Sequence, residues 1–285
     1  MTFYAQHPRV ARALAASVAI VVAACSGSAQ QESAAASPPS ASAVDSTSAS
    51  AAASASAAAA CPVGDARAGT RVLVFSRTKG FRHASIPDGV AAVTALGGRH
   101  GFAVEATEDA SAFTDPNLRR FAAVVFMSTT GDVLDATQQA AFERYVKGGG
   151  GFVGVHAAAD TENDWPWYGQ LVGAYFKSHP AIQDATLNVR DRSHISTKCL
   201  PALWNRRDEW YDFRTAPPSD AKILVTIDEK TYQNAKMGEF HPMAWYRAHD
   251  GGRAFYTALG HTSESFKEQA YLDHLAGGIL WAAAR

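Results

Sequence analysis

Five of the ten histidines lie where predicted strands end or in loops that contain glycine or proline. They are His83, His156, His179, His241 and His261. Ligands of open α/β sheets bind outside the carboxyl ends of the strands, so residues at such positions can converge on one site. A neutral imidazole is a good metal ligand and a good general base near neutral pH. The five histidines therefore indicate a site for acid–base chemistry or for a metal ion.

Local spacing does not decide between these two chemistries. The sequence contains no HxH or HExxH pair, so no single segment encodes a zinc motif. A divalent metal, if bound, would take its ligands from separate loops, and the candidates are His83, His156, His241 and His261. The acidic residues Asp208 and Glu209, which are adjacent in the sequence, offer carboxylates to the same site.

His156 has the most distinctive surroundings of the five histidines. Four glycines at 148–151 must end the preceding helix, and the apolar residues 152–155 are typical of a strand buried on both faces. Three alanines follow His156, so the segment has the outline of a nucleophile elbow in which histidine takes the place of the nucleophile. The pattern predicts a side chain presented to a pocket. The alternative is a core histidine bonded to a backbone carbonyl.

Aromatic residues are a second group with a functional and a structural interpretation. Their rings can pack against the apolar faces of sugars, or they can form the core beneath long loops. The residues concerned are Trp165, Trp167, Tyr168, Trp204, Trp210, Tyr211 and Trp245.

The elements that would position these residues follow an α/β pattern. Buried strands are expected at 71–76, 102–107, 121–127 and 152–155, with helices at 87–99 and 135–147 between them. This alternation predicts a doubly wound, mostly parallel sheet. The second half adds a short aromatic helix at 165–173 and a closing amphipathic helix at 266–284. Further short strands are expected between them, at 182–190, 208–213, 223–227, 240–246 and 253–258.

The first residues have the form of an export signal. Arg9 and Arg12 precede an apolar run at 13–24, which is too short for a conventional membrane-spanning helix. Small residues then lead to Cys25, as at a lipoprotein cleavage site. We expect residues 1–24 to be a lipoprotein signal peptide and Cys25 to carry the lipid. The alternative is an ordinary signal peptide with an incidental cysteine.

Composition divides the remainder of the chain into two parts. Residues 25–61 are mostly alanine and serine, cannot bury a core, and are expected to be a disordered tether. Residues 62–285 are expected to form one domain, anchored to a membrane and periplasmic. With 26 basic and 27 acidic residues the chain has a net charge of -1, which gives no indication of nucleic-acid binding. Cys61 and Cys199 could form a disulfide in an oxidising compartment.

Several ordered motifs together carry a resemblance to a known family. They are FRHASI at 81–86, GGGFVGVHAAAD at 149–160, WYGQLVGAYF at 167–176, HP at 179–180, DEWY at 208–211, HPMAW at 241–245 and GRAFYTALGH at 252–261. The chain resembles the ThuA-like, or trehalose utilisation, family, whose fold is similar to that of class I glutamine amidotransferases (flavodoxin-like). The resemblance implies this sheet without its catalytic cysteine, because His156 stands in that position. It therefore argues against glutamine hydrolysis.

The same resemblance implies a role in sugar metabolism, on 3-keto-glycosides made by a partner sugar oxidoreductase. We expect an exported, lipid-anchored enzyme in which His156 and His241 act as acid and base and Asp208 and Glu209 orient them or bind hydroxyls. Residues expected to bind the carbohydrate are His83, Trp165, Trp210, Tyr211 and His261. Two alternatives are a non-catalytic carbohydrate-binding or scaffold protein, and a metal-dependent hydrolase with histidine ligands from loops.

Overall fold

A computed structural model describes residues 61–284. The expected signal peptide, the lipidation site at Cys25 and all of the expected tether except Cys61 lie outside the described residues. Within 61–284, no helix has the length and apolar character needed to cross a bilayer.

Five parallel strands form the first half of the central sheet. They are β1 (Arg71–Phe75), β2 (Ala103–Thr107), β3 (Ala123–Met127), β4 (Gly151–Val155) and β11 (Gly252–Thr257). Every residue of β3 and β4 is buried, as their continuous apolar sequences predict. Their carboxyl ends meet at one edge of the sheet, which is where the histidines at 83, 156 and 261 follow β1, β4 and β11.

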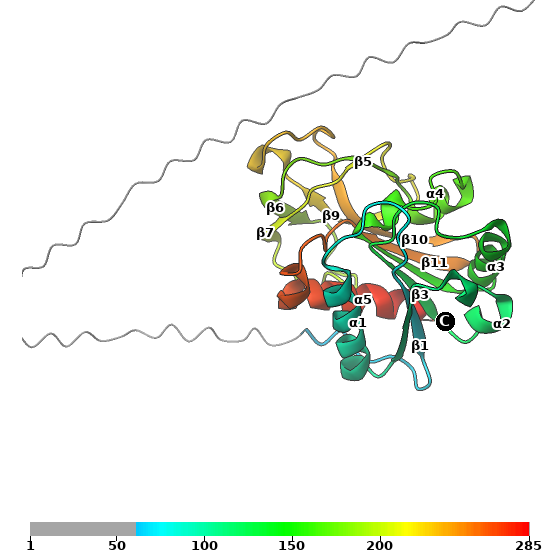
Figure 1. Ribbon diagram of the computed structural model, residues 1–285. Helices are drawn as coiled ribbons and strands as arrows, with labels where there is room; N and C mark the ends of the chain where they lie inside the picture. The colour runs from blue at the N-terminus through cyan, green and yellow to red at the C-terminus, as the bar shows by residue number, and fades with distance from the viewer. Residues whose placement is uncertain (1–60, 285) are drawn as a thin grey trace, which may run out of the picture. The chain divides into compact units, whose positions relative to one another are not determined.

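Antiparallel strands extend the sheet on the β11 side. They are β10 (Pro242–His249), β9 (Lys222–Ile227), β6 (Gln183–Val189) and β7 (Leu203–Asp208). The nine strands lie in the order β2-β1-β3-β4-β11-β10-β9-β6-β7. The expected α/β fold with added antiparallel strands is confirmed (Figure 1). A separate pair is formed by β5 (Phe176–Ser178) and β8 (Asp212–Phe213).

Helices cover both faces of the sheet, as a doubly wound fold requires (Figure 1). The helices α1 (Ile86–His100) and α5 (Gln269–Ala283) contact each other on one face. The other face carries α2 (Asp115–Leu118), α3 (Ala136–Lys147) and α4 (Pro166–Val172). Short 3₁₀ turns occur at Ala110–Ala112, His156–Asp160, Glu229–Thr231 and Ser265–Lys267.

A capping box fixes the start of the helix that precedes β4. The Asp135 carboxylate accepts hydrogen bonds from the backbone of Thr137 and Gln138, and the Gln138 side chain accepts one from the backbone of Asp135. These bonds satisfy N–H groups that have no partner within the helix. The helix ends before the glycines, and the chain then enters β4, which leads to His156.

The expected pairing of Cys61 with Cys199 is present as a disulfide, with a Cα–Cα distance of 5.8 Å. It joins the first described residue to the loop before β7, across 138 positions of sequence. A crosslink over so long a separation restricts the unfolded chain more than the folded one. The disulfide therefore stabilises the attachment of the start of the domain to its antiparallel half.

One core histidine makes the stability depend on pH. His274 is fully buried, its Nδ1 bonds the Ser196 carbonyl, and burial lowers its pKa to about 3. In the unfolded chain the same imidazole takes up a proton near pH 6.5, so the unfolded state binds more protons at mildly acidic pH. We expect this residue alone to lower the free energy of unfolding by about 1.4 kcal/mol between pH 7.5 and pH 5.5. Urea titrations at both pH values measure the loss, and the variant His274→Asn should reduce the pH dependence.

Candidate functional site

His156 lies at the end of β4 with a backbone φ of 48°, a left-handed conformation that is uncommon for a residue other than glycine. Its ring is completely buried, and Nδ1 donates a hydrogen bond of 2.8 Å to the carbonyl of Ala258. One ring nitrogen therefore makes the backbone contact that the core interpretation predicts. The other, Nε2, faces a group of polar side chains at the carboxyl ends of the strands.

Three imidazoles and one carboxylate converge at this edge of the sheet. We call His83, His156, Glu209 and His261 the histidine cluster; one donor atom from each lies within 4.8 Å of the donor atoms of the others. His156 Nε2 is 3.1 Å from His261 Nδ1 and 3.4 Å from Glu209 Oε2. His261 Nδ1 is 3.1 Å from the same carboxylate oxygen. The prediction that histidines after separate strands meet is confirmed for these three.

Burial and mutual contact shift the pKa values within the histidine cluster. Burial, with His156 and His261 nearby, lowers the pKa of His83 to about 3. Burial alone would raise the pKa of Glu209, but the contacts from His156 and His261 outweigh it and bring it to about 2. Burial lowers the pKa of His261, and Glu209 raises it by more, so its pKa lies above the usual value. Glu209 is therefore ionised at neutral pH and His83 is neutral.

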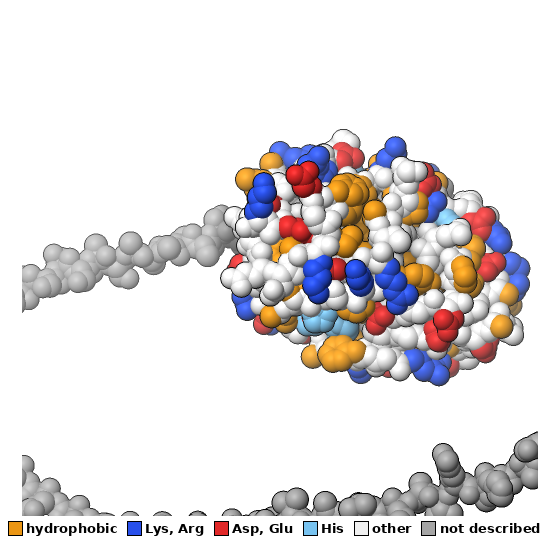
Figure 2. Space-filling view, turned by 90° about the horizontal axis from the view of Figure 1, so that it is seen from above, with side chains coloured by type: hydrophobic (Ala, Val, Ile, Leu, Met, Phe, Trp, Pro, Cys, Tyr) orange, Lys and Arg blue, Asp and Glu red, His pale blue; other side chains and the backbone are white. Residues whose placement is uncertain are grey.

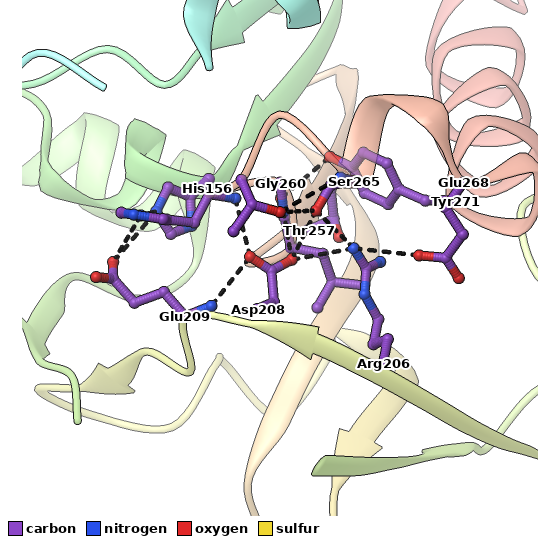
Figure 3. A network of polar contacts seen from close by, with 12 residues as sticks. His156, Arg206, Asp208, Glu209, Thr257, Gly260, Ser265, Glu268 and Tyr271 are labelled. Carbon is purple, nitrogen blue, oxygen red and sulfur yellow. Dashed lines mark hydrogen bonds and ion pairs between the residues drawn. The ribbon is translucent and has the colours of Figure 1, made fainter. Parts of the chain in front are cut away.

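Asp208 holds the backbone that carries two members of the histidine cluster (Figure 3). It is fully buried, and Oδ1 accepts hydrogen bonds from the backbone N–H groups of Glu209 and His261. Oδ2 accepts bonds from the Gly260 N–H and the Ser265 hydroxyl, and lies 3.1 Å from a guanidinium nitrogen of Arg206. Asp208 therefore positions the backbone of Glu209 and His261 and is not itself exposed in the site.

A pocket of about 330 Å³ opens above the histidine cluster. It has both ionisable and aromatic walls, lined by Phe81, His83, Thr130, Asp160, Phe176, His179, Glu209, Tyr211 and His261. On the face shown in Figure 2, histidine side chains gather at the surface beside a hydrophobic group. A larger pocket of about 480 Å³ beside β9 contains no histidine in its lining, so the smaller pocket is the candidate site.

His179 lies at the edge of this pocket; the sequence includes it among the five candidate histidines but assigns it no specific role. Its Nδ1 is 3.0 Å from Glu209 Oε1 and 2.9 Å from the carbonyl of Pro180, and 43% of its side chain is exposed. Both contacts are with acceptors, so Nδ1 carries the proton and Nε2 is left to exchange one. The sequence signal was present, because His179 was one of the five loop histidines.

Neither of the two histidines expected to act as acid and base lines the pocket. His156 lies beneath the pocket and not in its wall, because its ring is fully buried. His241 belongs to a second group with Asp212 and Glu229; its Nε2 donates to the carbonyl of Tyr211, and its Nδ1 is 2.9 Å from Glu229 Oε1. The expectation that it joins the other three histidines is therefore wrong.

Two of the expected carbohydrate-binding rings are in the core. The indole N–H of Trp165 bonds Glu143, and that of Trp210 bonds the carbonyl of Gln183. Neither ring lines the pocket, so the structural interpretation holds for both. Tyr211 does line it, with its ring 4.2 Å from that of His156, and Phe81, which the sequence did not single out, is 67% exposed there.

The chain is similar to known proteins over most of its length. A family model described as ThuA, trehalose utilisation, matches residues 71–282. A putative ThuA-like protein from Bacteroides uniformis is 24% identical, with a TM-score of 0.63 over 78% of this chain and 93% of that one. One from Parabacteroides merdae is 23% identical, with a TM-score of 0.62 over 75% and 90%. Comparison with curated protein sequences gives no match.

Proposed function

The chain belongs to the ThuA family, and from this premise and the pocket above the histidine cluster we propose that it is an enzyme acting on a sugar or a 3-keto-glycoside by histidine-based acid–base chemistry. One observation carries the proposal: Glu209 Oε1 holds Nδ1 of His179 at the edge of the pocket and leaves Nε2 free to exchange a proton. A carboxylate that fixes one nitrogen of an imidazole in this way is a recurrent arrangement in general-base catalysis.

A 3-keto sugar offers such a base a proton to remove. The carbonyl at C3 acidifies the C–H bond at C2, so His179 Nε2 can take that proton, and the C–H electron pair forms an enolate over C2, C3 and the carbonyl oxygen. The carbonyl then re-forms as a double bond forms between C1 and C2 and the C1–O bond to the leaving group breaks, and the departing oxygen must receive a proton. Asp160 lines the same pocket, and burial raises its pKa, so it is suited to supply this proton.

The aromatic wall of the pocket suits a sugar ring. Phe81 is 67% exposed, unusual for a phenylalanine, and its ring meets the edge of His83 at 4.9 Å between centroids. Phe176 and Tyr211 lie on the same pocket with centroids 4.3 Å apart. Rings of this kind pack against the apolar C–H face of a pyranose, while Asp160, Thr130 and the histidines meet its hydroxyls.

We also propose that the protein is exported and lipid-anchored through Cys25, as the start of the sequence predicts. The Cys61–Cys199 disulfide supports export, because structural disulfides persist mainly in oxidising compartments such as the periplasm. A sugar oxidoreductase in the same compartment would supply the keto sugar.

Incubation of the full-length protein with oxidised and unoxidised disaccharides tests the enzymatic proposal. We expect release of the free aglycone sugar from 3-keto-disaccharides and none from the parent disaccharides. Chromatography measures the released sugar. Saturable binding of either sugar without any product would instead establish a carbohydrate-binding protein, and the enzymatic proposal would fail.

A further inference from the structure

We infer that the histidine cluster of His83, His156, Glu209 and His261 is a binding site for a divalent transition-metal cation. The inference rests on the proposed function only for the part that the cation plays in the reaction. The binding itself is argued from the contacts of the four side chains. His179, the base proposed above, is not one of the residues that would coordinate the cation.

The spacing of the donor atoms suits coordination to one ion. His156 Nε2, His261 Nδ1 and Glu209 Oε2 form a triangle with sides of 3.1, 3.1 and 3.4 Å. Ligand atoms about 2.0 to 2.2 Å from a tetrahedral zinc ion are separated by about 3.3 to 3.6 Å. Small adjustments of three side chains would therefore place an ion between them, with His83 as the fourth ligand.

Hydrogen bonds to atoms that would not coordinate the ion hold these residues in place, so that their donor atoms face one another. Nδ1 of His156 donates to the Ala258 carbonyl at 2.8 Å, so the proton lies on that nitrogen and the lone pair of Nε2 faces the cluster. Asp208 binds the backbone N–H groups of both Glu209 and His261. Glu209 uses its other oxygen, Oε1, for His179, which leaves Oε2 for an ion.

His83 provides an independent observation. It is only 5% exposed, and its Nδ1 is buried and has no hydrogen-bond partner among the described residues. Its ring lies edge-on to His156 and His261, with centroid separations of 4.8 and 5.0 Å. A buried polar atom without a partner costs free energy, and a cation coordinated by that nitrogen would remove the cost.

The donor set also indicates which ions fit. Three imidazoles and one carboxylate favour zinc and its first-row neighbours over magnesium and calcium, which prefer oxygen ligands. A cation here would lie at the floor of the pocket that His83, Glu209 and His261 line. Bound there, it would polarise the carbonyl oxygen of a keto sugar and stabilise the negative charge that develops when the C2 proton leaves.

Zinc titration of the full-length, untagged protein after chelator dialysis tests the inference, with calorimetry as the readout and no sugar present. We expect one equivalent of Zn²⁺ to bind. The variants His83→Ala and His261→Ala should each weaken binding by at least about tenfold. Circular dichroism and thermal unfolding check that both variants fold. Asp212→Asn, in the second group with Glu229 and His241, is the matched control and should bind zinc like the unaltered protein.

Three results would overturn the inference: no zinc binding, unchanged affinity in folded variants of both His83 and His261, or binding that only Asp212→Asn abolishes. The outcome is separate from that of the sugar assay. Zinc binding without turnover of any keto sugar would leave the metal site standing and remove the proposed function. Turnover by protein that binds no zinc would do the reverse.

Discussion

Replacement of His179 by alanine is expected to lower kcat for a 3-keto-disaccharide by a factor of about 10² to 10⁴, the usual contribution of a positioned general base. The variant removes a pocket imidazole whose Nδ1 lies 3.0 Å from Glu209 Oε1 and whose side chain is 43% exposed. KM should change much less, because the aromatic wall at Phe81 and Tyr211 is untouched. Steady-state kinetics at several substrate concentrations separates the two parameters.

Rescue of the His179→Ala variant by added imidazole distinguishes a catalytic role of His179 from a purely structural one. Because 43% of the His179 side chain is exposed, the space left by the alanine is accessible, and free imidazole should restore part of the activity. His249→Gln is the matched control: His249 pairs with Gly252 at the start of β11, at the opposite edge of the sheet from the pocket. Less than a tenfold loss in His179→Ala, or a comparable loss in the control, would remove His179 from the reaction.

The sequence predicted the parallel half of the fold because its signals are local. The strands β3 and β4 are unbroken apolar runs, as is β1 after Arg71, and Asp135 with Gln138 forms the capping box that starts α3. The strand β7 was missed because its sequence, LWNRRD, places arginines in a strand whose side chains alternate between buried and exposed. The buried Arg206 is stabilised there by Asp208 and by the rings of Trp204 and Tyr271, contacts that depend on the tertiary fold.

The site was predictable only as far as topology could bring residues together. His83, His156 and His261 follow three parallel strands of one sheet, so their meeting follows from the strand order. His241 instead precedes β10, an antiparallel strand, and its ring turns to Glu229 beside β9. Trp165 and Trp210 were misassigned because composition does not show whether a ring faces a pocket or the core; their buried indole N–H groups find partners within the fold.

Asp208 is the residue on which most of this arrangement depends, because its one carboxylate serves two purposes. Its contacts with the N–H groups of Glu209, Gly260 and His261 fix the two segments that carry Glu209 and His261, two of the four members of the histidine cluster. Its contact with Arg206 neutralises a cation whose side chain is only 3% exposed. Within residues 61–284, Nε and Nη1 of Arg206 already have no hydrogen-bond partner, and the next carboxylate, Glu268, is 3.4 Å away. Removing the carboxylate therefore leaves a buried charge poorly compensated.

We expect Asp208→Ala to lower the free energy of unfolding by about 3 to 5 kcal/mol, as is usual when one partner of a buried ion pair is lost. Urea unfolding at pH 7.5 measures the change. Asp184→Ala is the control on the adjoining strand: Asp184 pairs with Arg207 at 3.3 Å, but the two side chains are 80% and 60% exposed, so no measurable change is expected. A loss below about 1 kcal/mol in Asp208→Ala would show that Glu268 and the rings around Arg206 compensate its charge without Asp208.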